Sequence, residues 1–102
     1  MDDFTTRAIA VIKRIPSGKV TTYGMVAAAA GNHCGARQVA RILYSSSEKH
    51  GLPWHRVVNA TLRVSLRADP AGQCRQRQRL VAEGVEFVGE RIPRSFRWEA
   101  GL

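Results

Sequence analysis

The chain has 102 residues and a hydrophobic fraction of 44%, which fits a single globular domain over residues 1–102 and argues against wholesale disorder. No run approaches the ~18 consecutive apolar residues of a membrane-spanning helix, so we expect no membrane partner. Sixteen Lys and Arg oppose eight Asp and Glu and give a net charge of +8, and such a basic domain favours a nucleic-acid partner.

The start of the chain and its cysteines bear on compartment and cofactors. Met1-Asp2-Asp3 is acidic, unlike the basic start of a secretory signal. We therefore expect a cytoplasmic protein, associated with the nucleoid if the source is bacterial. Cys34 and Cys74 stand forty residues apart and form no C-x-x-C pair of the zinc-binding kind. We expect two free thiols, no metal and no other cofactor.

The first predicted element is an amphipathic helix over residues 4–14, where apolar side chains recur close to a 3.6-residue period. Asp2 or Asp3 is its expected N-cap. Pro16, Ser17 and Gly18 then supply a turn that ends the helix. Residues 20–21 are expected to form a short extended segment.

Two short helices follow and predict a helix-turn-helix. Thr22 is the expected N-cap of an alanine-rich helix over residues 23–30, which Gly31 ends. A turn over residues 32–35 leads to a second helix over residues 36–44. The side chains expected to face outward are Arg37, Gln38 and Arg41, and those expected to face inward are Val39, Ile42 and Leu43.

The next segments predict a loop, a turn and a hairpin. Residues 45–50 are polar and are expected to form a loop, and residues 52–58 contain a proline turn. Residues 56–67 are rich in β-forming side chains, and Val64 and Leu66 alternate with polar residues. That pattern is typical of a half-buried strand or hairpin arm.

The last part of the chain adds one helix and a closing strand. After a loop over residues 68–72, we expect a helix over residues 73–83 that ends at Gly84, with Cys74, Leu80 and Val81 facing inward. Residues 85–88 are expected to form a strand. Phe96 and Trp98 are expected to anchor an extended tail on one face. Together the elements predict an α+β, mainly α fold of the winged helix-turn-helix type, with the hairpin as the wing.

The residue inventory gives little support for an enzyme. Cys34 lies near a predicted helix start, where thiols become more reactive, but only His33 stands beside it as a base. Cys74 lies on a predicted apolar face and fits the core better. The serine run at residues 45–47 lacks the glycines of a nucleophile elbow. We therefore expect a binding protein rather than a catalyst.

Trp54 occupies a turn that has the form of an active site, Pro53-Trp54-His55-Arg56. An indole takes no transferred group, but it offers a large flat surface for stacking. Periodicity alone favours core packing for this residue. The stacking and cationic groups that an extrahelical base requires are nevertheless present, as Tyr23, Arg37, Trp54, Arg56, Arg63 and Arg67.

Four motifs in order resemble the alkyltransferase-like proteins, relatives of the DNA-binding domain of O6-alkylguanine-DNA alkyltransferase. They are Ile-Pro-Ser-Gly-Lys-Val-Thr-Thr-Tyr-Gly at residues 15–24, Gly-Ala-Arg-Gln-Val at 35–39, Pro-Trp-His-Arg-Val-Val at 53–58 and Leu-Val-Ala-Glu-Gly-Val at 80–85. The resemblance covers residues 4–87. In the alkyltransferases the third motif is Pro-Cys-His-Arg-Val, and its cysteine takes the alkyl group irreversibly. Trp54 at that position is the hallmark of the alkyltransferase-like branch.

The resemblance implies a DNA-binding surface on the helix-turn-helix, which in this family enters the minor groove. Arg37 resembles the arginine finger that fills the gap left by a flipped guanine. Tyr23 matches the tyrosine that rotates the 3′ phosphate. The further residues expected to contact DNA are Thr22, Gln38 and Arg41.

The resemblance also implies a lesion pocket. Its expected lining is Tyr23, Trp54, His55, Val57 and Arg67, with the Arg67 guanidinium over the flipped base. His55 and Glu83 match the histidine and glutamate that activate the family's cysteine through a water, and without a thiol they are expected to be a structural relict. Ser46 stands where the family has a pocket-loop asparagine that braces the turn.

The function that the resemblance implies is that of a non-enzymatic DNA-damage sensor. We expect a monomer that binds and flips O6-alkylguanine in double-stranded DNA, blocks alkyltransferase action and directs the lesion to nucleotide excision repair proteins. One alternative is a winged-helix transcription regulator without lesion specificity, because charge, helix-turn-helix and wing fit it equally well. Residual alkyl transfer through Cys34 or Cys74 is another, although neither thiol lies in the pocket motif.

Overall fold

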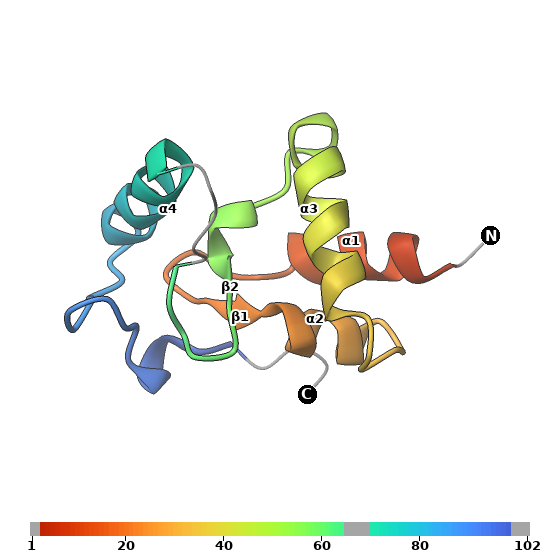
Figure 1. Cartoon of the computed structure of the whole chain (residues 1–102), viewed down its shortest axis with the longest axis horizontal. Coiled ribbons are helices and arrows are strands. Elements are labelled where there is room, and N and C mark those ends of the chain that lie inside the picture. The colour runs from red at the N-terminus through yellow and green to blue at the C-terminus, as the bar shows by residue number, and fades with distance from the viewer. Residues whose placement is uncertain (1–2, 65–69, 99–102) are drawn as a thin grey trace.

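The computed structural model describes residues 3–64 and 70–98, and of residues 46–48 and 70–74 it describes the backbone alone. Figure 1 shows the helices α3 and α4 on either side of a central segment that holds both short strands. Helix dominates the described residues, and the predicted α+β, mainly α class is confirmed. In chain order, the elements are α1 (Phe4–Lys13), β1 (Thr21–Thr22), α2 (Tyr23–Ala29), α3 (Ala36–His50), the 3-10 turn η1 (Trp54–Arg56), β2 (Val57–Val58), α4 (Pro70–Ala82) and the 3-10 turn η2 (Arg94–Phe96).

The N-terminal helix α1 begins and ends where its sequence predicts. Asp3 is the N-cap, and its carboxylate accepts a hydrogen bond from the Thr6 amide at 2.8 Å. Such a cap satisfies one of the amides that the first helical turn leaves without a partner. The inward face of the helix buries Ala8, Val11 and Ile12, which belong to the periodic apolar set that predicted it.

Helices α2 and α3 form the predicted helix-turn-helix. The Thr22 hydroxyl caps α2 by accepting from the Met25 amide at 3.1 Å. Gly35, just before α3, lies so close to Phe4 that an added Cβ would stand 2.8 Å from the phenyl ring, so a larger residue would force the ring or the start of α3 to shift. Val39, Ile42 and Leu43 face the core as expected.

Helix α3 is longer than predicted. Residues 45–50 were expected to form a loop, but the helix continues through His50. The Ser45 hydroxyl donates to the carbonyl of Arg41 at 2.9 Å, so this polar residue is satisfied inside the helix instead of ending it. Gly51, with a φ of 62°, provides the left-handed residue that stops α3.

The strands pair in a way that the sequence did not predict. β1 and β2 form a parallel pair, with Thr21 opposite Val57 and Thr22 opposite Val58. The residues after Val58 turn back through hydrogen bonds from Leu62 to Asn59 and from Asn59 to Arg63, at 3.0 and 3.3 Å. Within residues 56–64, the predicted hairpin is therefore a tight turn without a ladder. Its remainder, residues 65–67, lies outside the described residues.

Helix α4 begins earlier and faces differently than expected. Its first residue is Pro70, which was assigned to a loop. Proline suits the first helical turn because the amide that it lacks has no intrahelical partner there. Leu80 is fully buried as predicted, but Val81 is 54% exposed, and the polar side chain of Gln76 is buried instead. The face that α4 turns toward the core is therefore defined by the buried Gln76 and Leu80, and not by a continuous apolar stripe.

The chain after α4 contains no strand within the described residues. Residues 85–88 make only an isolated antiparallel bridge, in which Val88 and Arg91 exchange backbone hydrogen bonds at 2.8 and 3.2 Å. The tail instead runs beside β1. The Val20 amide donates to the carbonyl of Phe96 at 2.8 Å, and the amide of Trp98 donates to the carbonyl of Val20 at 2.7 Å.

The core has two parts that meet at β2. The first cluster lies among α1, α2 and α3 and includes Val57, and Trp54 and Trp98 pack against it. The second lies beneath α4 and the tail and includes Val58, with Phe96 packed against it. Because successive strand residues point to opposite sides, Val57 and Val58 join the two parts. The two tail aromatics therefore contact different clusters, contrary to the single face expected.

Candidate nucleic-acid interface

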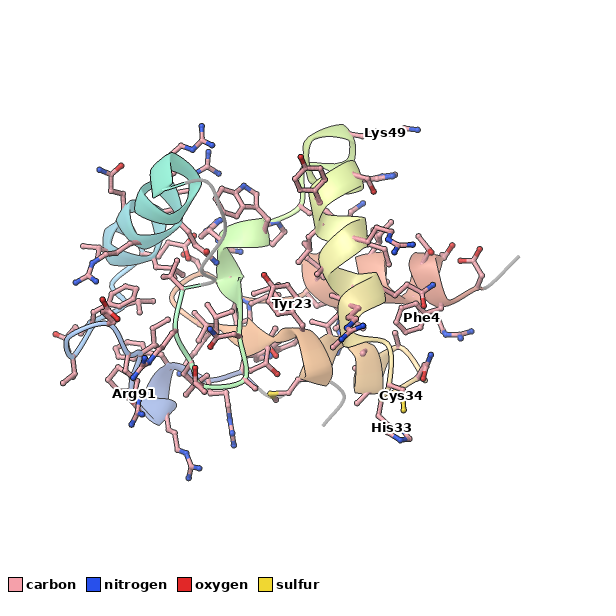
Figure 2. All side chains as sticks on the ribbon, viewed as in Figure 1. Phe4, Tyr23, His33, Cys34, Lys49 and Arg91 are labelled. Carbon is pink, nitrogen blue, oxygen red and sulfur yellow. The ribbon has the colours of Figure 1, made fainter. Side chains whose placement is uncertain are left out.

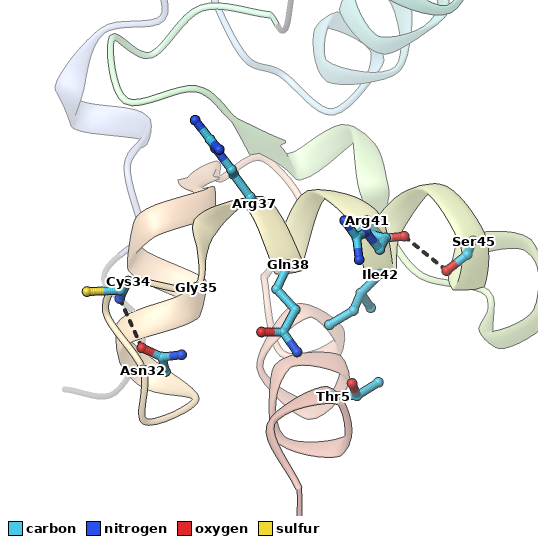
Figure 3. A pocket seen from close by; sticks show the side chains of 9 residues that line it. All are labelled: Thr5, Asn32, Cys34, Gly35, Arg37, Gln38, Arg41, Ile42 and Ser45. Atoms are coloured by element: carbon cyan, nitrogen blue, oxygen red, sulfur yellow. Dashed lines mark hydrogen bonds between the residues drawn. The ribbon is translucent and has the colours of Figure 1, made fainter.

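The outer surface of α3 presents two cations and an amide. Arg37, Gln38 and Arg41 are exposed, as the sequence predicts. They border an open hollow of about 510 Å³ between the start of α3 and α1, which Thr5 and Ile42 also line. Figure 3 shows the Gln38 side chain directed toward Thr5 and that of Arg37 directed away from α1. The helix can therefore offer a projecting guanidinium to a partner while its amide stays near the protein surface.

The turn between α2 and α3 is stabilised by the side chain of one of its own residues, Asn32. The Asn32 carboxamide oxygen accepts from the amide of Cys34 at 3.1 Å, which is an Asx-type turn. Cys34 is an exposed free thiol, and Figure 2 shows it with His33 at the end of this turn, far from Tyr23. Cys74 has no described side chain. Cys34 is thus placed at the edge of the helix-turn-helix and outside the segment that holds Trp54.

Thr22 and Tyr23 lie where β1 passes into α2. The Thr22 side chain is buried and its hydroxyl oxygen is used by the helix cap. Tyr23 is half-buried and packs against the first cluster, near the centre of the molecule in Figure 2. Of the two, Tyr23 is the more exposed residue, while Thr22 chiefly fixes where the helix begins.

Trp54 opens the short turn η1. The turn is closed by hydrogen bonds from the Trp54 amide to the carbonyl of Leu52 at 2.8 Å and from the Arg56 amide to that of Pro53 at 3.0 Å. The indole is half-buried against the first cluster. The His55 ring meets it edge-on, with centroids 6.2 Å apart. The indole thus packs on the core, as periodicity predicts, and keeps an accessible portion; its stacking on an extruded base stays a prediction.

Beside Trp54, the carboxylate of Glu83 gathers three donors. Nε2 of His55 lies 2.9 Å from Oε2. The Arg56 guanidinium donates to both carboxylate oxygens and, through Nη1, to the carbonyl of Ile15 at 2.9 Å. The Gly18 amide donates to Oε1 at 3.2 Å. The network joins η1, the end of α4 and the turn after α1.

The same contacts set the charge state of Glu83. Burial alone would raise the pKa of its carboxyl, but the hydrogen bonds from Arg56, His55 and Gly18 prevail and lower that pKa from 4.5 to about 2. Glu83 is therefore ionised at neutral pH, and Nε2 of His55 carries the proton that it donates. Nδ1 of His55 is buried without a hydrogen-bond partner among the described residues.

Gln76 and Arg79 on α4 complete the surroundings of η1, and sequence reasoning missed both. The buried Gln76 amide donates to the carbonyls of His55 and Val57, at 3.2 and 3.0 Å. The Arg79 guanidinium lies over the Trp54 indole, 5.5 Å from its centroid. Gln76 and Arg79 are three residues apart and so share one helix face, a spacing that could have placed them together.

Some predicted site residues cannot be placed. Arg67 lies outside the described residues, and the side chain of Ser46 is not described. Val57 is fully buried in the core, so it supports the segment around Trp54 from within.

Among the described residues, no three His, Cys, Asp or Glu side chains are grouped as a metal site. No described helix combines the length and apolarity needed to cross a membrane.

Comparison with known proteins fixes the class of this fold and site. Residues 3–85 match the family described as 6-O-methylguanine DNA methyltransferase, DNA binding domain. The chain is 41% identical over 101 residues to a DNA base-flipping protein of Vibrio parahaemolyticus, covering 97% of this chain and 99% of that one. It is 42% identical over 87 residues to Alkyltransferase-like protein 1 of Schizosaccharomyces pombe, covering 85% and 81%.

A solved structure narrows the class further. The crystal structure of S. pombe Atl1 in complex with damaged DNA containing O6-carboxymethylguanine superposes with a TM-score of 0.83 at 36% identity, covering 96% of each chain. That agreement confirms the predicted winged-helix fold. The chain belongs to the alkyltransferase-like family.

Proposed function

We propose that this protein is a non-enzymatic sensor that binds O6-alkylguanine in double-stranded DNA and holds the base outside the helix. The observation that carries the proposal is the position of Trp54. It stands directly before a complete His55–Glu83 hydrogen-bonded pair, with a partly accessible indole instead of a thiol. The names of the relatives, a DNA base-flipping protein and Atl1 in complex with damaged DNA, support the same activity.

The exposed face of α3 is the part suited to the duplex. Its cations, Arg37 and Arg41, lie four residues apart on one helix face. We assign Arg37 to the gap that a flipped guanine leaves, because its guanidinium projects from the helix (Figure 3). Arg41 is assigned to the phosphate backbone, where a cation contributes by releasing counterions. Gln38 borders the same hollow, and Tyr23 is assigned to the phosphate beside the lesion.

The segment around Trp54 is the part suited to the extruded base. Flipping a base costs a few kcal/mol of stacking and pairing, which a stacking surface and cationic neighbours offset. The indole supplies the surface, and Arg67 is assigned to the opposite side of the base. The Glu83 network supports this pocket by fixing His55 and Arg56, the two residues that follow Trp54.

Alkyl transfer is not part of the proposed function. In the reactive relatives, a thiol at position 54 would receive the alkyl group. Indole does not act as such a nucleophile under biological conditions, so the His55–Glu83 pair has no group to activate. What remains is retention of the lesion, by which the protein would block alkyltransferase action and direct nucleotide excision repair proteins to the site. We propose that it does so as a monomer.

The test is a salt-controlled comparison of two duplexes that differ by one O6-methyl group. The proposed sensor binds the O6-methylguanine duplex more tightly than the guanine duplex, while its mass is unchanged after incubation. Equal affinity, together with preference for a selected undamaged sequence, would point to a transcription regulator. A gain in protein mass of one CH2 unit, as when a methyl group replaces a thiol hydrogen, would instead show an enzyme acting through Cys34 or Cys74.

A further inference from the structure

Arg79 is a cation whose side chain, among the described residues, contacts an aromatic ring and not an anion. Its side chain is exposed on α4, and its guanidinium carbon lies over the Trp54 indole, 5.5 Å from the ring centroid. A cation over the face of an indole is attracted by the ring's quadrupole. The contact holds the guanidinium against the aromatic surface while its N–H groups stay open to a ligand. Arg79 thus stands against the ring that we assign to the base pocket.

No carboxylate within the described residues neutralises Arg79. The nearest along the helix is Glu83, one turn later, but its oxygens are occupied by His55, Arg56 and the Gly18 amide. The Arg79 side chain forms no ion pair or hydrogen bond with any other described residue. Because a guanidinium carries five N–H donors in a planar fork, its hydrogen-bonding capacity is left for a bound molecule.

The neighbourhood of Arg79 carries an excess of positive charge. Helix α4 contains no Asp or Glu from Pro70 to Ala82 and carries Arg75, Arg77 and Arg79. The only described acidic side chain in the network beside Trp54 is Glu83, and the Arg56 guanidinium balances it. An anionic group that reached the indole would therefore meet attraction without a facing carboxylate.

We infer that Arg79 makes the pocket selective for O6 adducts that carry a carboxylate, a role that rests on the function proposed above. A guanine stacked beside Trp54 would direct its O6 substituent along the pocket wall. A carboxylate on that substituent can accept two parallel N–H bonds from one guanidinium, whereas a neutral adduct of the same size cannot. Arg79 then acts as a specificity-determining residue for acidic adducts.

A phosphate of the bound strand is the other anion that Arg79 could meet. The two anions, the backbone phosphate and the carboxylate of the adduct, can be told apart by how the binding affinity depends on the adduct. A phosphate contact contributes equally to every duplex, damaged or not, because it reads no base. A contact to the adduct changes only the affinity for the duplex that carries the acid.

Arg77 provides a matched control two residues away. It is also an exposed arginine over an aromatic ring, with its guanidinium carbon 4.4 Å from the Phe87 centroid. Its Nη1 donates to the carbonyl of Gly89 at 3.3 Å, so it lies toward the tail and not toward Trp54. Substitution of either residue by glutamine removes one charge from the same helix.

The experiment measures affinity at fixed ionic strength for four duplexes that contain guanine, O6-methylguanine, O6-carboxymethylguanine or its neutral isostere O6-carbamoylmethylguanine. Wild type is expected to favour the acid over the amide by about tenfold, the size expected for hydrogen bonds to a charged group. Arg79→Gln is expected to bring that ratio close to one and to leave the O6-methylguanine affinity within about twofold. Arg77→Gln is expected to keep the wild-type ratio. Thermal unfolding of each variant verifies its fold.

Other outcomes overturn the inference in distinguishable ways. An acid-to-amide ratio that Arg79→Gln leaves unchanged removes Arg79 from specificity. An equal loss on all four duplexes assigns it to the phosphate backbone. If wild type binds O6-methylguanine but does not favour the acid, the sensor function stands and the selectivity fails. If wild type does not separate O6-methylguanine from guanine, both fail.

Discussion

Arg56 and Arg37 carry the same charge, but the fold treats them in opposite ways. The Arg56 guanidinium is bound by Glu83 and by the carbonyl of Ile15, so it joins η1 to α4 and α1. Arg37 is exposed on α3, at the edge of an open hollow (Figure 3). The comparison shows that a net charge of +8 does not measure what is available to DNA. Some cations hold the protein together, and others face outward.

The largest change in stability should come from removing Glu83, the anion that binds the Arg56 guanidinium. Glu83→Gln leaves the guanidinium and the His55 imidazole without their carboxylate, and we expect a loss of about 3 kcal/mol in the free energy of unfolding. The melting temperature should fall by about 10 °C or more, as measured by thermal unfolding. Glu86→Gln, an exposed neighbour, is the control and should change little. A Glu83→Gln melting temperature equal to wild type would contradict the structural role of the network.

The outward cation should show the reverse pattern. Arg37→Ala is expected to weaken binding to an O6-methylguanine duplex by about 2 kcal/mol, the size of an interface hot spot, with an unchanged melting temperature. Fluorescence anisotropy with labelled duplex measures the affinity. The control is Arg91→Ala, which removes an exposed arginine that lies far from Cys34, a residue near the start of α3 (Figure 2). Wild-type affinity in Arg37→Ala would exclude the residue from the binding surface.

Acid should weaken the contact of the inward cation, Arg56, because it protonates the Glu83 carboxylate. The pKa of Glu83 is about 2 in the folded protein, against 4.5 for a glutamate without these contacts, as in the unfolded chain. Because folding lowers this pKa, the stabilisation is complete above pH 4.5 and is lost as the pH falls toward 2. We expect this group to account for about 1.5 kcal/mol of the acid-induced loss, after solvent screening. Urea unfolding at pH 7, 4 and 3 measures the free energy of unfolding at each pH. In Glu83→Gln this free energy should fall less steeply with decreasing pH than in wild type. An equal fall in both proteins would rule out Glu83 as the source.

The smallest effect should be at Arg41. As a phosphate contact, it should contribute equally to damaged and undamaged duplexes, and Arg41→Ala should cost about 0.5 kcal/mol on each. The slope of log affinity against log salt should decrease by about one. Titrations at several salt concentrations measure both quantities. A loss confined to the damaged duplex would move Arg41 into the same class as Arg37.

Local sequence signals predicted one half of the molecule well. The N-cap residues Asp3 and Thr22 and the apolar periodicity of α1 and α3 correspond to what the structure shows. These elements depend on neighbours within a few residues, which a sequence displays directly. Even there, α3 runs on to His50, because Ser45 bonds back to Arg41 and its polarity no longer signals an end.

Long-range pairing made the other half harder to predict. Thr21 lies beside Val57 in a parallel pair, and no local pattern announces a strand of two residues. In the candidate site, the resemblance singled out His55 and Glu83, which the structure brings into contact. Gln76 was missed because a glutamine between arginines looks like part of a solvated face. Its burial depends on the carbonyls of η1, which approach it only in the folded chain.

The reach of the Glu83 side chain has a consequence for the order of folding. Its contact with Gly18 closes a loop of 65 residues, whereas α1, α2 and α3 meet through short connections. Contacts of high sequence separation form late, so we expect the helix-turn-helix to assemble first and α4 to dock afterwards. Breaking the Glu83 contacts would then accelerate unfolding more than it slows folding. A chain caught before docking would already present Arg37, but it would have no pocket in which to hold a base.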